Sequence, residues 1–198
     1  MSVSTRTLTL ADLAWPRSGA LRNVLLIVGA SLVTALAARI EIKVPWTLVP
    51  ITGQTFAVLL SGAVLGARRA FAAQLLYLAE GAAGLPVFAG GGAGLATFAG
   101  PTAGYLVGFP IGAAVTGALV ERRWDRRFIT MLPAMLLGSA PIFALGLAWL
   151  SRFLPADQLL AAGLVPFLPG DVIKATLAAL AFPAAWRLAR SRGGARDA

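Results

Sequence analysis

The sequence predicts an all-α, polytopic membrane protein with six transmembrane helices in a single membrane-embedded domain covering residues 1–198. Hydrophobic residues make up 58% of the chain and charged residues only 13%, which is about half the charged share of a soluble domain. Several apolar runs approach or exceed the roughly 17–25 residues with which a helix crosses a bilayer. Because such runs occupy almost the whole chain, no separate soluble domain is expected.

Six apolar segments are expected to form the spanning helices. They cover about residues 21–38, 48–66, 67–84, 101–120, 128–150 and 170–188. A tight turn at Arg68–Arg69 is expected between the second and third segments. The alternative for the first segment is a signal peptide cleaved after Ala35–Leu36–Ala37, but the region of roughly twenty residues before it is long for a signal peptide.

The distribution of basic residues predicts the orientation of the helices. If six spans alternate, one side collects thirteen of the 17 Lys and Arg residues: Arg6, Arg17, Arg22, Arg68, Arg69, Arg122, Arg123, Arg126, Arg127, Arg187, Arg190, Arg192 and Arg196. The other side holds Arg39, Lys43, Arg152 and Lys174. The positive-inside rule then places both termini in the cytoplasm. The net charge of +9 therefore indicates membrane topology, and nucleic acid is not an expected partner.

Two spans carry small residues at four-residue spacing. Ala30, Thr34 and Ala38 share one face of the first span, and Gly100, Gly104, Gly108 and Gly112 share one face of the fourth. Small residues let helix backbones approach closely in lipid. The glycine series favours packing inside the bundle, whereas the series on the first span fits either internal packing or contact with another subunit.

Polar side chains at membrane depth are few, and each is costly there and a candidate for function. They are Gln54, Gln74, Glu80, Asp171 and Lys174. Asp171 and Lys174 lie three residues apart at the start of the sixth span and so share a helix face. Two interpretations remain open for them: an ion pair that neutralises itself, or one acceptor and one cation presented to a small polar ligand.

The segment of residues 84–100 contains no charge, yet its glycines and its proline oppose a regular span. Irregular backbone at a membrane is tolerated where it is buried in protein or lines a cavity. The amides of Gly90 and Gly91 could then donate to a ligand, Phe88 could cover an apolar one, and Tyr105 could supply a hydroxyl and a ring. A flexible external loop is the alternative.

Several classes of chemistry are excluded by what the sequence lacks. It contains no cysteine and no histidine, which removes thiolate nucleophiles, imidazole bases and the usual zinc ligands. Neither Lys43 nor Lys174 follows a glycine, so no Walker A motif is present. No catalytic residue, metal site or cofactor is expected, and any ATP-driven step would need another chain.

Three segments resemble the biotin-specific S components of energy-coupling factor (ECF) transporters, the BioY family. They are residues 49–56 (VPITGQTF), residues 84–109, and residues 167–174 (FLPGDVIK). The resemblance implies a multi-pass protein of the bacterial cytoplasmic (inner) membrane that captures biotin from the outside as a transported substrate. It also implies a membrane coupling subunit (T component) and a pair of cytoplasmic ATPases as partners.

The resemblance also implies roles for individual residues. Asp171 and Lys174 look like the family's ligand contacts, and Ala30, Thr34 and Ala38 like its docking face, although Thr34 replaces the usual alanine. With the residues singled out above, the expected substrate-binding set is Gln54, Phe88, Gly90, Gly91, Tyr105, Asp171 and Lys174. The alternatives are an S component for another small vitamin and an ion-coupled carrier or channel, for which the spans hold few ionisable groups.

Overall fold

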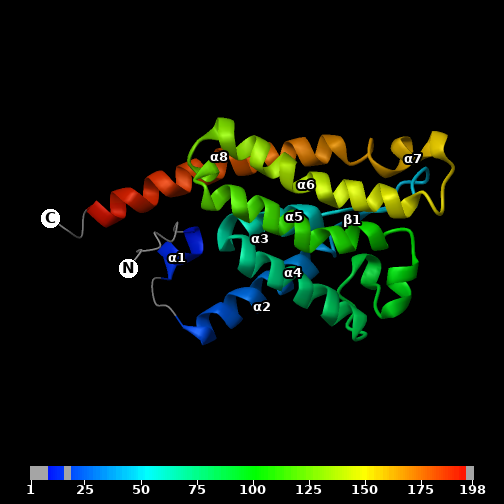
Figure 1. The fold of residues 1–198 in the computed structure, drawn as a ribbon, viewed down its shortest axis with the longest axis horizontal. Coiled ribbons are helices and arrows are strands. Elements are labelled where there is room, and N and C mark those ends of the chain that lie inside the picture. The colour runs from blue at the N-terminus through cyan, green and yellow to red at the C-terminus, as the bar shows by residue number, and fades with distance from the viewer. Residues whose placement is uncertain (1–8, 16–18, 195–198) are drawn as a thin grey trace, which may run out of the picture.

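The computed structural model describes residues 9–15 and 19–194, and most of these residues belong to one elongated helical bundle (Figure 1). The long helices are α2 (Ala20–Ala37), α3 (Gln54–Leu65), α4 (Ala67–Ala82), α5 (Ala103–Glu121), α6 (Phe128–Leu150) and α8 (Leu168–Gly194). Two shorter helices are α1 (Leu10–Ala14) and α7 (Ala156–Gly163). In Figure 1, α1 lies near one end of the bundle and α7 at the other. The predicted all-α class is confirmed.

Four described segments are long and apolar enough to cross a membrane: α2, α5, α6 and the stretch Ala156–Leu188 that contains α7 and most of α8. α3 has 12 residues and α4 has 16, fewer than the roughly 20 of a typical span. Of the arginines that predict orientation, Arg6, Arg17 and Arg196 lie outside the described residues, as do the side chains of Arg190 and Arg192.

The second expected segment begins later than predicted. Strand β1 (Glu41–Ile42) pairs antiparallel with β2 (Ile51–Thr52), in a register that places Glu41 opposite Thr52, and α3 starts only at Gln54. Pro50 has no N–H to donate and disfavours helical backbone at Val49. The prediction of helix over residues 48–53 is therefore wrong. This stretch contains the second strand of a hairpin that was not predicted from the sequence.

The turn between α3 and α4 lies at Gly66, whereas the prediction placed it at Arg68–Arg69. Gly66 has a φ of 81°, a left-handed conformation that glycine adopts without steric cost. Both arginines lie in the first turn of α4. A carboxylate oxygen of Glu121 accepts from the backbone N–H of Ala67 at 2.9 Å, which satisfies one of the amides left free at a helix start.

α5 is the central helix and contacts α3, α4 and α6. Its glycines allow α6 to approach closely: a Cβ at Gly108 would lie 2.7 Å from the Cα of Ile142, and one at Gly112 would lie 2.7 Å from the carbonyl oxygen of Gly138. Gly104 meets α6 in the same way. Internal packing is thus confirmed for three of the four glycines, while Gly100 precedes the helix and has no such neighbour on α6.

The small-residue face of α2 packs mainly inside the chain. Thr34 and Ala38 are fully buried, and the side-chain amide of Gln74 on α4 donates to the Thr34 hydroxyl at 3.2 Å. Ala30 is half-buried. The outward face of α2 consists instead of large apolar side chains, among them Leu21 and Leu36.

A three-way ion cluster fastens α1 to α2 and α4. The carboxylate of Asp12 accepts from Arg22 at 2.9 Å and from Arg69 at 2.7 Å. Burial alone would raise the pKa of Asp12, but the hydrogen bonds from Arg69, Thr9 and Arg22 outweigh it and lower the pKa to about 2. The carboxylate therefore stays charged at any physiological pH and holds these helices together.

α8 is fixed near its C-terminal part by the segment between α5 and α6. The indole N–H of Trp186 donates to the carboxylate of Asp125, which is fully buried. The guanidinium of Arg126 lies 3.0 Å from the centre of the Trp186 ring, a cation–π contact. α8 also packs along α6, and near its start Lys174 reaches Thr55 on α3.

Candidate substrate-binding site

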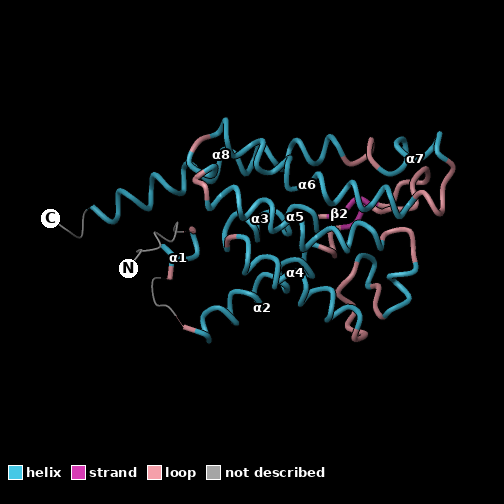
Figure 2. Tube along the Cα trace, viewed as in Figure 1, coloured by secondary structure: helices cyan, strands magenta, loops and turns pink. Residues whose placement is uncertain are grey.

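A cavity of about 310 Å³ is lined in part by β2. Figure 2 shows β2 in the half of the bundle where most loops gather. The volume of the cavity is at the lower end of the roughly 300–1,000 Å³ typical of small-molecule sites. The lining comes from the hairpin, α3, the segment 84–102, α5, α6 and α8. The lining residues are Leu48, Val49, Pro50, Ile51, Thr52, Gln54, Thr55, Phe88, Ala89, Thr97, Pro101, Thr102, Tyr105, Leu106, Phe109, Phe143, Phe167, Asp171 and Lys174.

Asp171 and Lys174 both line the cavity, but they do not form an ion pair. The Lys174 ammonium donates to the Thr52 carbonyl at 3.0 Å and to the Thr55 hydroxyl at 3.1 Å, and among the described residues no salt bridge joins it to Asp171. Asp171 is 6% exposed. Since an ammonium has three donors, these two bonds leave one for a ligand. This arrangement favours ligand binding over a self-neutralising pair.

Aromatic rings form the apolar part of the wall. Tyr105 and Phe143 lie edge to face with their ring centres 6.4 Å apart, and Phe167 lies 6.2 Å from Tyr105 and 6.1 Å from Phe143. The Tyr105 hydroxyl donates to the Gly163 carbonyl at 2.7 Å, so its proton is already engaged by the protein. Tyr105 therefore offers a ligand mainly its ring.

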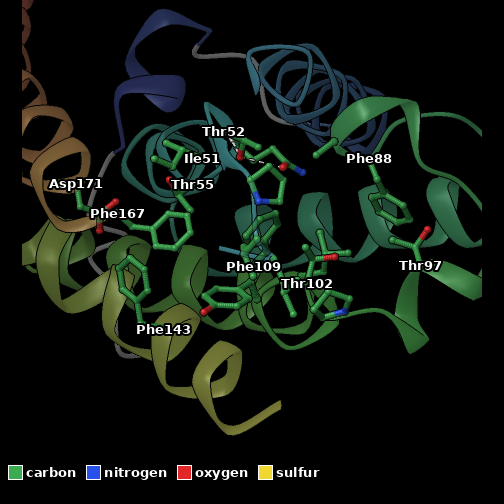
Figure 3. A pocket seen from close by; sticks show the side chains of 18 of the residues that line it. Ile51, Thr52, Thr55, Phe88, Thr97, Thr102, Phe109, Phe143, Phe167 and Asp171 are labelled. Atoms are coloured by element: carbon green, nitrogen blue, oxygen red, sulfur yellow. Dashed lines mark hydrogen bonds between the residues drawn. The ribbon is translucent and has the colours of Figure 1, made fainter. Parts of the chain in front are cut away.

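The segment 84–100 closes the side of the cavity opposite α8. Figure 3 shows Phe88 and Thr97 on one side and Asp171 and Phe167 on the other. Phe88 is 2% exposed, and its ring packs edge to face against Phe98 with the centres 5.6 Å apart. The segment contains two short 3₁₀ turns, Ala89–Gly91 and Leu95–Ala99. The prediction that it lines a cavity is confirmed by Phe88, Ala89 and Thr97.

Gly90 and Gly91 are not among the residues that line the cavity. Their φ angles are 63° and 78°, and the left-handed backbone directs them toward the hairpin. A Cβ at Gly90 would lie 3.1 Å from a carboxylate oxygen of Glu41, and one at Gly91 would lie 3.5 Å from the guanidinium of Arg39. In the structure these glycines shape the turn that presents Phe88 and lie away from the lining.

The cavity thus brings together five of the seven substrate-binding residues predicted from the sequence: Gln54, Phe88, Tyr105, Asp171 and Lys174. The prediction omitted Thr52 and Thr55, which hold Lys174, and the rings of Phe109, Phe143 and Phe167. Four of these residues fall within the segments that resemble the family and could have been found there: Thr52, Thr55, Phe109 and Phe167. Phe143 lies inside an apolar run, where nothing in the sequence separates a cavity ring from a core ring.

The helices are apolar, and they surround a small cavity that has aromatic rings in its wall and an acid and an amine on one side. This arrangement is that of a membrane protein that binds a small molecule with polar groups. The chain belongs to the BioY family, whose family model matches residues 5–191.

Individual relatives agree with this assignment. The chain is 42% identical over 159 residues to the biotin transporter BioY of Rhizobium etli, covering 76% of this chain and 85% of that protein. It is 41% identical over 172 residues to the biotin transporter BioY of Rhodobacter capsulatus, covering 80% and 90%. The crystal structure of the S component for biotin from an ECF-type ABC transporter matches with a TM-score of 0.75 and 25% identity, covering 84% of this chain and 92% of that one.

Proposed function

We propose that this chain is the biotin-binding S component of an ECF-type vitamin importer. The observation that carries the proposal is the cavity of a BioY-family chain, whose lining suits each part of biotin. The fused rings are apolar and fit among aromatic side chains, while the ureido group and the carboxylate need donors and acceptors. Asp171 supplies an acceptor and Lys174 a cation, both in a largely buried setting.

The energy for uptake comes, in this proposal, from other subunits. The chain has no Walker A motif, so it is a substrate-binding transport protein that relies on a T component and a cytoplasmic ATPase pair. Of the three residues proposed for docking, only Ala30 keeps exposed surface, because Thr34 and Ala38 are fully buried. We therefore place the T-component contact on Ala30 and the exposed apolar residues of α2 beside it.

The proposed orientation puts six helices through the bacterial cytoplasmic membrane, with both termini in the cytoplasm and the cavity at the outer side. Four arginines are exposed at the start of α4 or between α5 and α6, and none of them lines the cavity: Arg68, Arg122, Arg123 and Arg127. Basic residues collect on the cytoplasmic side of membrane proteins, so these arginines support a cytoplasmic location for that end of the bundle. The six spans are α2, α3, α4, α5, α6 and α8. α3 is short for a span, and in this proposal the hairpin before it covers the rest of the membrane thickness.

Labelling of single cysteines tests the orientation, since the chain has none of its own. Cysteines at Ala93 and Ala156 are expected to react with a membrane-impermeant maleimide in intact cells. A cysteine at Trp124 is expected to react only after the membrane is opened. Reaction of Trp124→Cys from the outside would contradict the six-span arrangement.

Direct ligand analysis tests the substrate. Protein purified from cells grown with biotin is expected to retain it, as detected by mass spectrometry after denaturation, and labelled biotin added to the emptied protein is expected to rebind. Competition with other vitamins should leave biotin binding unchanged. Displacement of biotin by another vitamin at equal concentration would favour an S component of different specificity.

A further inference from the structure

We propose that Tyr77 is a positioning residue of the biotin site, which holds two walls of the cavity together without touching the ligand. The inference rests on the proposed function. Tyr77 lies on α4, is fully buried and is absent from the cavity lining. Its hydroxyl lies between the first residue of α3 and the segment that carries Phe88.

Two hydrogen bonds make this connection. The side-chain amide nitrogen of Gln54 donates to the Tyr77 hydroxyl at 2.6 Å. The Tyr77 hydroxyl donates to the backbone carbonyl of Val87 at 3.0 Å, and Val87 directly precedes Phe88. One buried hydroxyl therefore joins α3 to the opposite wall.

The chemistry of the groups fixes the direction of these bonds. A carbonyl can only accept, so the single Tyr77 proton goes to Val87, and Tyr77 must accept from the nitrogen of Gln54. The amide oxygen of Gln54 then faces Thr52, whose hydroxyl donates to it at 3.0 Å. Both ends of the Gln54 amide are satisfied in only this orientation.

The same series of bonds reaches the ligand-binding amine. Lys174 on α8 donates to the Thr52 carbonyl at 3.0 Å, so the connection runs from Lys174 through Thr52, Gln54 and Tyr77 to Val87. Buried hydrogen-bond networks of this kind favour a single arrangement when every member is satisfied. The position of the Phe88 wall is thereby linked to the position of Lys174.

The Tyr77 ring supports the same wall by packing. It lies edge to face with Phe88, the ring centres 5.4 Å apart, and stacks on Phe109 at 6.4 Å. Replacing Tyr77 with phenylalanine would keep these ring contacts and remove only the hydroxyl. The Gln54 amide and the Val87 carbonyl would each lose a buried partner, and the wall would open more readily.

Biotin kinetics on the purified, isolated chain test the role. We expect Tyr77→Phe to release biotin roughly tenfold faster or more, because two buried polar groups would be left without a partner in the loosened wall. The association rate should change much less, as is usual for changes in affinity. A merely structural tyrosine would instead lower the amount of folded protein and leave the dissociation rate of the folded fraction unchanged.

Thr34→Val is the matched control. The Thr34 hydroxyl is also fully buried, accepts from a side-chain amide at 3.2 Å and donates to the Ala30 carbonyl at 3.1 Å, but it does not border the cavity. Its biotin dissociation rate is expected to stay within about twofold of the unmodified chain, because no bond to a cavity wall is lost. Equal acceleration in both variants would overturn the proposal, as would an unchanged rate in Tyr77→Phe.

A labelling experiment keeps the test independent of biotin affinity. In the Ala89→Cys background, without biotin, adding Tyr77→Phe is expected to speed the reaction of the cysteine with a maleimide, while adding Thr34→Val is not. Identical labelling rates in all three proteins would overturn the positioning role. If the unmodified chain failed to bind biotin, the proposed function would fall, and the labelling rates would still decide whether Tyr77 holds this wall.

Discussion

Lys174→Ala and Asp171→Asn are each expected to weaken biotin binding by roughly ten- to a hundredfold, because a charge-assisted hydrogen bond contributes about 1.5–3 kcal/mol. Lys174 has an additional task in the structure, since its ammonium also holds the Thr52 carbonyl and the Thr55 hydroxyl. Its removal should therefore loosen the wall as well as remove a ligand contact. We expect the larger loss for Lys174→Ala.

Two exposed residues of the same types provide the controls. Lys43 is the only other lysine of the chain and its side chain is 81% exposed, and Asp157 is exposed in the first turn of α7. Lys43→Ala and Asp157→Asn should bind biotin like the unmodified chain. Biotin affinity by titration calorimetry and the melting temperature should be measured on all four variants. Unchanged affinity with a lowered melting temperature in the cavity variants would mean that Asp171 and Lys174 are structural.

Asp171 and Lys174 could be singled out from the sequence because charge is rare in this chain and costly in a membrane. The structure places both at the cavity, and their contact with the ligand stays a prediction. α2, α4, α5 and α6 begin and end within about two residues of the predicted bounds, and so does the start of α8. Apolar runs that are bounded by charge or glycine leave few alternatives for the ends of a helix. The C-terminal end of α8 lies further along the chain than predicted. The hairpin at Glu41–Ile42 and Ile51–Thr52 was missed for the opposite reason. Its strands are too short for an alternating pattern, and they lie beside an apolar run that continues into α3.

The remaining parts of the site depend on tertiary contacts that no local pattern encodes. Tyr77 occupies a helix position that would suit any buried aromatic residue, and only the approach of Gln54 and Val87 gives its hydroxyl a role. The same holds for the small-residue face of α2. The four-residue spacing of Ala30, Thr34 and Ala38 fitted either packing inside the chain or contact with another subunit. In the structure Thr34 and Ala38 are fully buried, and Gln74 on α4 donates to Thr34, so most of this face packs inside the chain.

Gly81→Ala is expected to weaken biotin binding by roughly tenfold, through a side chain that never reaches the cavity, because overpacking typically costs about 1–3 kcal/mol. Gly81 is buried on α4, and a Cβ there would overlap the ring of Phe88. The ring is confined on its other sides by Tyr77 and Phe98. Its open direction is the cavity that it lines, so the added methyl group would push Phe88 into the space needed by the ligand.

Gly29→Ala serves as the control, because the added methyl group should disturb neither Phe88 nor the cavity. Gly29 also lies within a helix, but a Cβ there would have no neighbour within 4 Å, and alanine is favoured over glycine in a helix by about 1 kcal/mol. We therefore expect Gly29→Ala to leave biotin affinity unchanged and to keep or raise the melting temperature. Normal affinity in Gly81→Ala would show that Phe88 can move elsewhere, and the Phe88 wall would then not define the size of the site.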